Sequence, residues 1–301
     1  MDATPSVSLP PDAESGVPQR PPQALEIGGR LFAWGTRTYV MGIINVTPDS
    51  FSGDGLLAHT DPVRAAVAQA RQMAAEGADL LDIGGQSTRP GHAQISAEEE
   101  LTRAVPVVAA VRAALPAMPL SIDTTSGRVA AAALDAGADL INDVWGTAAE
   151  PGLLSLAAER GTPVVLMHNR AEARYANVVA EVIADLQHGL DAAVRAGISW
   201  ERLIVDPGIG FGKTPEHNLA VLHDLVALRV LARPILLGAS RKSTIGKVLD
   251  VPADQRVEGT LATTALGVAA GIDIVRVHDV QPNVRAARMA DSVIRPGWGH
   301  S

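Results

Sequence analysis

Residues 203–206 read Leu-Ile-Val-Asp, an unbroken run of three apolar residues that ends in a carboxylate. A continuous apolar run, rather than an alternating one, is typical of a strand that is buried on both faces of a parallel sheet. Seven other short runs of this kind occur along the chain, at residues 40–44, 80–83, 120–122, 140–142, 163–167, 235–237 and 272–277. The sequence therefore predicts eight buried strands.

Ala-rich amphipathic stretches lie between these runs and predict helices. One covers residues 63–76, with Asp61 as the cap and Pro62 in the first turn. Another begins at Ser96-Ala97-Glu98-Glu99, a capping-box pattern, and runs towards Leu115. Further helices are predicted at residues 127–136, 153–159, 178–196, 216–230, 257–270 and 281–294.

Eight strand–helix units over about 240 residues match the size of a (β/α)₈ barrel. A doubly wound sheet is the alternative, but it seldom needs eight such runs, and its G-x-G-x-x-G turn is absent. Residues 25–40 contain a Gly28-Gly29 turn between two apolar segments and predict a hairpin. The predicted fold class is thus α/β: a (β/α)₈ TIM barrel with a short N-terminal β-hairpin. Residues 25–301 would form a single domain, and the Pro-rich residues 1–24 a disordered tail.

Composition narrows the class of protein. The chain has 301 residues, a formal net charge of −8 and no cysteine. The acidic balance disfavours nucleic acid as a partner, and no apolar run reaches the roughly 18 residues of a membrane span. The absence of cysteine excludes a disulfide scaffold and a thiol nucleophile, and it fits a reducing compartment. With no secretory signal at its start, the chain is expected to be cytoplasmic, with no membrane partner.

Polar residues follow nearly every predicted strand. In a barrel the working side chains lie at the carboxyl ends of the strands. Taken singly, an Asp or Asn there is as often a turn residue, and a buried His such as His168 is more often a satisfied core residue than a ligand. Convergence on one rim favours a site instead. The candidates are Asn45, Thr88, Arg89, Asp123, Asn142, Asp206, Ser240, Lys242, Arg276 and His278.

The basic candidates and the acidic or amide candidates lie in different strand–helix units. Cations gather in the last two units, where barrels frequently bind phosphate; they are Arg241, Lys242, Arg276 and His278. Arg276 and His278 stand two residues apart on one strand, so they point to the same side and can hold one anion.

Acids and amides occupy the middle units, at Asp123, Asn142 and Asp206. A carboxylate can accept two parallel hydrogen bonds from a ring N–H and an exocyclic amine, as on a pterin or purine. The two groups together indicate a substrate that carries both an anion and a polar heterocycle.

Two segments, residues 46–60 and 84–95, are rich in Gly, Ser and Pro and are predicted to be loops that cover a ligand. Residues 208–214 end like a Walker A loop, but Pro207 stands where its first glycine is required. An NTPase is therefore not indicated.

Several of these segments resemble the dihydropteroate synthase family in sequence and in order, across roughly residues 25 to 295. The most specific are Asn-Val-Thr-Pro-Asp-Ser-Phe-Ser at 45–52, Asp-Ile-Gly-Gly-Gln-Ser-Thr-Arg-Pro-Gly at 82–91 and Asp-Pro-Gly-Ile-Gly-Phe-Gly-Lys-Thr at 206–214. Gln86 departs from the family, which often has Glu there, and this puts any charge role at that position in doubt.

The resemblance implies condensation of (7,8-dihydropterin-6-yl)methyl diphosphate with 4-aminobenzoate, giving 7,8-dihydropteroate and pyrophosphate. It implies that Asp123, Asn142, Asp206 and Lys242 hold the pterin. Arg276, His278 and Asn45 would bind the diphosphate, and Asn45 would be a ligand of the cofactor Mg²⁺. Thr88, Arg89, Ser240 and Phe51 would lie towards 4-aminobenzoate. A homodimer is also implied.

Two other functions stay open at this stage. A methyltetrahydrofolate-dependent methyltransferase shares the central Asp and Asn pattern, but it carries no diphosphate and gives no reason for Arg276 and His278. A catalytically silent pterin-binding paralogue would be expected to have lost some of Asn45, Arg89 and Lys242, which are all present.

Overall fold

The computed structural model describes residues 24–47, 56, 61–86, 95–146 and 151–295. The predicted N-terminal tail and most of the two predicted covering loops lie outside these residues. Thr88, Arg89 and Phe51 also lie outside them.

Eight parallel strands form the barrel in the part of the chain that the structure describes, in the order β8-β7-β6-β5-β4-β3-β10-β9. Their bounds are β3 Tyr39–Asn45, β4 Leu80–Gly84, β5 Leu120–Asp123, β6 Leu140–Asp143, β7 Val164–Met167, β8 Leu203–Asp206, β9 Leu236–Leu237 and β10 Ile274–Val277. The ring closes between β8 and β9, where the Val205 N–H donates to the Pro234 carbonyl at 3.0 Å. The predicted TIM barrel is confirmed.

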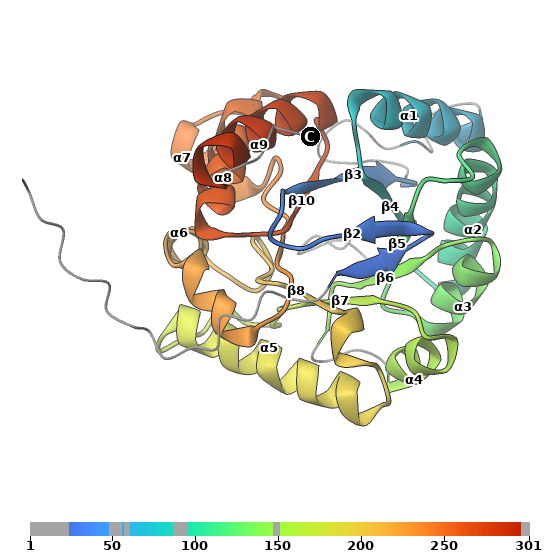
Figure 1. The fold of residues 1–301 in the computed structure, drawn as a ribbon, viewed down its shortest axis with the longest axis horizontal. Helices are drawn as coiled ribbons and strands as arrows, with labels where there is room; N and C mark the ends of the chain where they lie inside the picture. Colours follow the sequence, from blue (N-terminus) through green and yellow to red (C-terminus); the bar gives the residue numbers. More distant parts are fainter. Residues whose placement is uncertain (1–23, 48–55, 57–60, 87–94, 147–150, 296–301) are drawn as a thin grey trace, which may run out of the picture.

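Helices surround the strands as an outer ring (Figure 1). They are α1 Pro62–Glu76, α2 Ala97–Ala114, α3 Gly127–Asp135, α4 Pro151–Arg160, α5 Val178–Arg195, α6 Pro215–His223, α7 Ser243–Leu249, α8 Val257–Ala270 and α9 Val280–Ile294. Both predicted N-caps form: Asp61 accepts the Arg64 N–H, and Ser96 accepts the Glu99 N–H. The Glu99 carboxylate pairs with Arg103 instead of completing the predicted capping box. Each cap satisfies a donor that the first helical turn leaves unpaired.

The prediction of one continuous helix over residues 216–230 is wrong. α6 ends at His223, and Leu225–Leu231 forms a 3-10 helix. Its three leucines are buried and recur at every third residue, which matches the three residues per turn of a 3-10 helix. The short helix α7 was not predicted.

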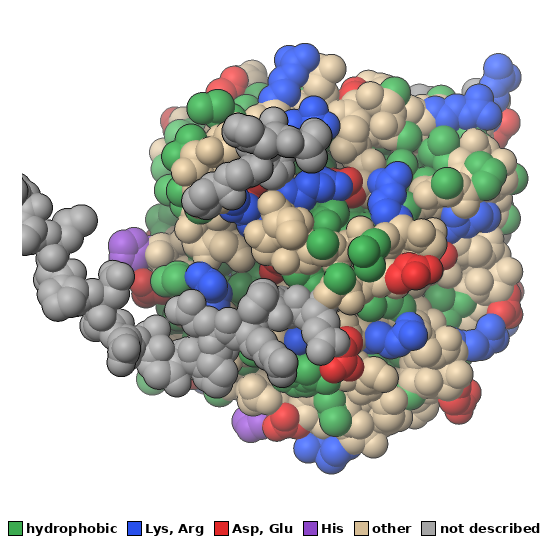
Figure 2. Space-filling view, viewed as in Figure 1, with side chains coloured by type: hydrophobic (Ala, Val, Ile, Leu, Met, Phe, Trp, Pro, Cys, Tyr) green, Lys and Arg blue, Asp and Glu red, His purple; other side chains and the backbone are tan. Residues whose placement is uncertain are grey.

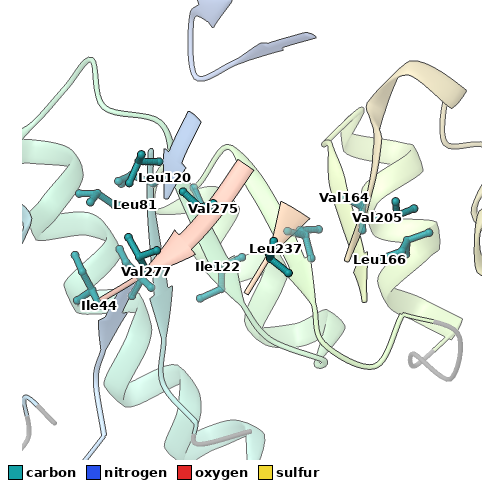
Figure 3. Packing of buried hydrophobic residues seen from close by; sticks show 14 of the residues in the cluster. Ile44, Leu81, Leu120, Ile122, Val164, Leu166, Val205, Leu237, Val275 and Val277 are labelled. Atoms are coloured by element: carbon teal, nitrogen blue, oxygen red, sulfur yellow. The ribbon is translucent and has the colours of Figure 1, made fainter. Parts of the chain in front are cut away.

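Alternate residues of each strand face opposite sides of the barrel wall, because successive side chains of a strand point in opposite directions. The outward residues pack against the helices and form the larger apolar cluster (Figure 3). They include Ile44, Leu81, Leu120, Ile122, Val164, Leu166, Val205, Leu237, Val275 and Val277. The inward residues at the start of the strands form a second cluster, which includes Met41, Leu80, Leu140, Val165, Ile204, Leu236 and Ile274.

The predicted hairpin is confirmed and covers the amino-terminal end of the barrel. β1 Leu25–Ile27 pairs antiparallel with β2 Arg30–Phe32, and the pair lies across the middle of the ring in Figure 1. Leu25, Ile27 and Phe32 belong to the same buried cluster as the inward strand residues. The hairpin therefore closes this end with apolar side chains.

Three aspartates secure the strands near the same end. Asp79, Asp139 and Asp273 each stand just before a strand, and each carboxylate accepts the backbone N–H of a residue on or beside a neighbouring strand. Asp139, for example, accepts the Leu120 N–H at 2.9 Å and is paired with Arg112. Because a buried backbone donor is costly to leave unpaired, these carboxylates stabilise the barrel.

We expect Asp139→Ala to lower the free energy of unfolding by about 2 kcal/mol, since it leaves the Leu120 N–H without its acceptor. Asp135→Ala is the matched control, because the Asp135–Arg160 pair is exposed and should contribute at most about 0.5 kcal/mol. Urea unfolding of both variants measures the difference. Equal losses would show that the Asp139 carboxylate is not a structural acceptor.

Candidate functional site

Towards the carboxyl ends of the strands, the inward positions change from apolar to polar. In β10, Ile274 lies in the inner apolar cluster, and Arg276, two residues later, faces the same side. The same change occurs from Leu80 to Asp82, from Leu140 to Asn142 and from Ile204 to Asp206. The barrel thus holds a polar layer above an apolar one.

Arg276 bridges two carboxylates across this layer. Its Nε donates to Asp82 Oδ2 at 2.6 Å, and its Nη2 donates to Asp123 Oδ2 at 2.7 Å. Asp82 is fully buried, and the Arg276 side chain is 16% exposed. Burial raises the pKa of the Asp123 carboxyl, and the Arg276 guanidinium opposes that rise. A guanidinium has five N–H donors, so Arg276 can hold both carboxylates and still donate to an anion.

Three side chains of the layer present hydrogen-bond acceptors. Asn142 Nδ2 donates to Asp82 Oδ2 at 3.0 Å, which fixes the amide so that its oxygen points away from Asp82. Asp123 Oδ1 is buried and has no hydrogen-bond partner among the described residues. Asp206 accepts the Gly208 N–H through Oδ1 at 2.7 Å. Burial raises the pKa of Asp206 to about 6, against the effects of the Gly208 N–H and Lys242.

The last two units place two predicted residues in contact. Ser240 Oγ accepts the backbone N–H of His278 at 3.2 Å and lies 2.9 Å from His278 Nδ1. The Ser240 hydroxyl can therefore donate to Nδ1, which leaves the imidazole proton on Nε2 as a donor for a ligand. Arg241, a predicted rim cation, forms an ion pair with Asp279.

Arg276 and His278 occupy alternate positions, separated by Val277 of the outer cluster. Arg276 lies within β10 and faces the inner side, whereas His278 lies just beyond the end of the strand, so the prediction that both residues stand on one strand is wrong.

The loop after β8 forms one wall of the layer. Lys242 Nζ lies 3.9 Å from the centre of the Phe211 ring, a cation–π contact that joins this loop to the residue before α7. Gly208 has a φ of +67°, and a Cβ there would lie 1.9 Å from the His168 carbonyl oxygen. Only glycine permits so close an approach of the loop to the end of β7.

Sequence reasoning did not select Asp82, Phe211 or Lys213 as site residues. Asp82 lies within an apolar run, and counting alternate positions from the inward Leu80 would have placed it inside the barrel. Phe211 and Lys213 have no such signal, because their positions depend on the path of a glycine-rich loop. His168 is fully buried and hydrogen-bonded at both ring nitrogens, in agreement with its interpretation as a satisfied core histidine.

The chain matches the family model described as "Pterin binding enzyme" over residues 41–278. It is 46% identical to the dihydropteroate synthase of Clostridium beijerinckii over 272 residues, which are 90% of this chain and 100% of the relative. The structure resembles that of Xanthomonas albilineans dihydropteroate synthase with 4-aminobenzoic acid, at a TM-score of 0.84 and 44% identity, covering 91% of this chain and 98% of the other. The same enzyme in complex with 7,8-dihydropteroate gives a TM-score of 0.79 at 41% identity, covering 90% and 98%.

The buried amine of Lys213 gives a prediction that can be checked directly. Burial lowers the pKa of Lys213 to about 7. The chain contains three lysines, at 213, 242 and 247, so a sample with ¹³C-labelled lysine should give few enough Cε signals to follow singly. One signal should titrate near pH 7 and be missing from Lys213→Met. The assignment is contradicted if the signal that this variant lacks titrates only above about pH 9.

Proposed function

The chain belongs to the dihydropteroate synthase family of pterin-binding enzymes, and we propose that it condenses (7,8-dihydropterin-6-yl)methyl diphosphate with 4-aminobenzoate. The products are 7,8-dihydropteroate and pyrophosphate, a step of folate biosynthesis. The observation that carries the proposal is a layer of buried acceptors from Asp123, Asn142 and Asp206 beside the cation Arg276. This layer suits a substrate that joins a polar heterocycle to an anion.

The acceptors fit the pterin edge. A pterin presents a ring N–H and an exocyclic amine side by side, which can donate to one carboxylate as two parallel bonds. Asp206 supplies such a carboxylate, and Asp123 and Asn142 supply further acceptor oxygens. Lys242, which lies over Phe211, would contact the ring from the other side. Recognition of this kind is selective, because a ligand without the donors would leave buried acceptors unpaired.

The cations fit the leaving group. The reaction breaks the bond between the methylene carbon and the diphosphate oxygen, so negative charge accumulates on pyrophosphate. Arg276 and the Nε2–H of His278 would stabilise this charge, and Asp82 and Asp123 hold the guanidinium in place beforehand. Preorganised donors of this kind are commonly the largest contribution to catalysis.

The attacking amine needs little help. The nitrogen of 4-aminobenzoate already carries a lone pair, forms the new C–N bond and then loses a proton. The pterin ring can delocalise positive charge on the methylene carbon, which favours early departure of pyrophosphate. We propose that four residues lie on the 4-aminobenzoate side: Ser240, Thr88, Arg89 and Phe51. Ser240 contacts His278, and the other three lie outside the described residues.

We propose Mg²⁺ as the cofactor, with Asn45 as its protein ligand. Asn45 ends β3 and carries an amide oxygen, a donor that suits magnesium. The described residues contain no group of three or more His, Cys, Asp or Glu that could hold a metal. This donor set fits Mg²⁺, which is commonly bound by few protein groups together with substrate phosphates. The ion, when bound, would neutralise charge on the phosphate oxygens.

A homodimer is proposed from exposed apolar side chains on the packed helices α8 and α9 (Figure 1). Leu266, Met289 and Val293 are 64%, 66% and 69% exposed, which is unusual for large apolar residues. A second copy of the chain would cover them.

Small molecules are the proposed partners. On the face in Figure 2, Lys and Arg side chains are interspersed with acidic and apolar ones and form no continuous basic patch that would bind nucleic acid. No helix in the described ranges is long and apolar enough to cross a membrane. The lack of cysteine supports a cytoplasmic location.

The direct test mixes the protein with the pterin diphosphate, 4-aminobenzoate and Mg²⁺ and measures pyrophosphate release. We expect turnover that EDTA abolishes. Arg276→Lys keeps a cation near Asp82 and Asp123 but loses the planar fork, so turnover should fall by roughly tenfold or more with little change in Tm. Wild-type turnover in this variant would remove Arg276 from the anion site, and no turnover in the wild-type protein would refute the proposed function.

Asp206 gives a pH dependence with a defined sign. Its pKa is about 6, and only the carboxylate accepts two hydrogen bonds, so pterin affinity should fall as the pH drops below about 6. Calorimetry with the pterin alcohol, which lacks the diphosphate, avoids titration of phosphate. Asp206→Asn should bind roughly tenfold more weakly at pH 7.5 and show a smaller pH dependence, because Asp123, whose pKa burial raises to about 7, still titrates. The exposed control Asp250→Asn should retain the wild-type affinity and pH dependence. A wild-type affinity that is constant from pH 5 to 7.5 would count against the role of Asp206.

A further inference from the structure

Lys213 lies at the end of the loop that follows β8, and no role in the proposed function is assigned to it. Its Nζ lies 2.7 Å from His168 Nδ1, 3.0 Å from the Gly208 carbonyl oxygen and 3.2 Å from the Phe211 carbonyl oxygen. In its protonated form the Lys213 amine has three donors, and these three acceptors surround it. Lys213 therefore ties two points of its own loop to the end of β7.

His168 is arranged to be an acceptor. Its Nε2 lies 3.0 Å from Asp185 Oδ2, and Asp185 also accepts Nε of Arg170 at 2.7 Å. Burial and the charge of Lys213 lower the pKa of His168 to about 4, so the ring is neutral at physiological pH. A neutral ring that donates from Nε2 to the carboxylate must present an unprotonated Nδ1, and this is the atom that faces Lys213.

Each of the two backbone carbonyls that Lys213 contacts belongs to a residue that supports a group of the proposed pterin site. The Gly208 N–H donates to Asp206 Oδ1, so fixing Gly208 also fixes the carboxylate. The Phe211 ring lies under Lys242, so fixing the Phe211 backbone fixes the surface on which that ammonium rests. Gly208, Gly210 and Gly212 all have positive φ, a backbone conformation that glycine adopts readily, and such a glycine-rich segment gains order from an external attachment.

We propose that Lys213 is a positioning residue for pterin binding, which acts by holding the 206–214 loop against neutral His168. This proposal rests on the proposed function, since the groups that it positions are those assigned to the pterin. Lys213 does not touch the substrate. It sets the position of Asp206 and of the Phe211–Lys242 pair before the substrate arrives.

Steady-state kinetics of Lys213→Met test the proposal. Methionine keeps most of the side-chain length and loses all three donors. We expect the KM for the pterin diphosphate to rise roughly tenfold while kcat falls less than about threefold, because the reacting groups remain present. Lys247→Met is the matched control, since Lys247 is exposed on α7 and should leave both constants unchanged. An unchanged pterin KM in Lys213→Met would overturn the proposal, as would equal losses in both constants.

A pair of His168 variants keeps the proposal testable should Lys213→Met fail to fold. The side-chain oxygen of His168→Asn stands close to the position of Nδ1 and can accept from Lys213, whereas that of His168→Gln reaches towards Asp185. His168→Asn should therefore retain a pterin KM near that of the wild type, and His168→Gln should raise it. The reverse order would overturn the proposal. Both outcomes presuppose wild-type turnover, whose absence would refute the proposed function instead.

Discussion

A closed barrel allows each strand to point only alternate residues at the axis, and this constraint arranges the whole molecule. One set of alternate positions is largely apolar, because it packs against the helices. In four strands, β4, β6, β8 and β10, the other set changes from apolar at the start to polar at the end. The chemistry that we assign to this protein occupies the second half of the inward set. The site is therefore held by the same wall that supplies the core.

Asp82 shows how closely the polar groups depend on one another. A single oxygen of its carboxylate accepts both Arg276 Nε and Asn142 Nδ2. The proposed anion site and the proposed heterocycle site thus share one buried acceptor. A carboxylate buried between such partners is costly to disturb, because removing either partner leaves charge without compensation. The two halves of the site are therefore coupled by position as well as by the substrate that joins them.

The eight strands could be predicted because each is buried on both faces and so appears as a continuous apolar run, as in 203–206. The polar residues at their ends could be predicted for the same reason, since they interrupt those runs. Asp82 was not predicted as a site residue because it lies inside an apolar run. Its inward direction follows only from counting alternate positions along β4. The 3-10 helix at Leu225–Leu231 was missed because an apolar spacing of three resembles the spacing of an α-helix over two turns. Lys213 depends on a glycine-rich loop whose path no local pattern defines.

The hairpin across the amino-terminal end has an electrostatic consequence. By covering that end with Leu25, Ile27 and Phe32, it shields the charged layer from water on that side, and the apolar residues beneath the layer have low polarisability. The apolar interior screens the charges of Arg276 and its neighbours less than water does at the opposite end of the barrel. Low-dielectric walls of this shape focus field lines outward. A ligand would therefore reach the polar layer from the carboxyl ends of the strands.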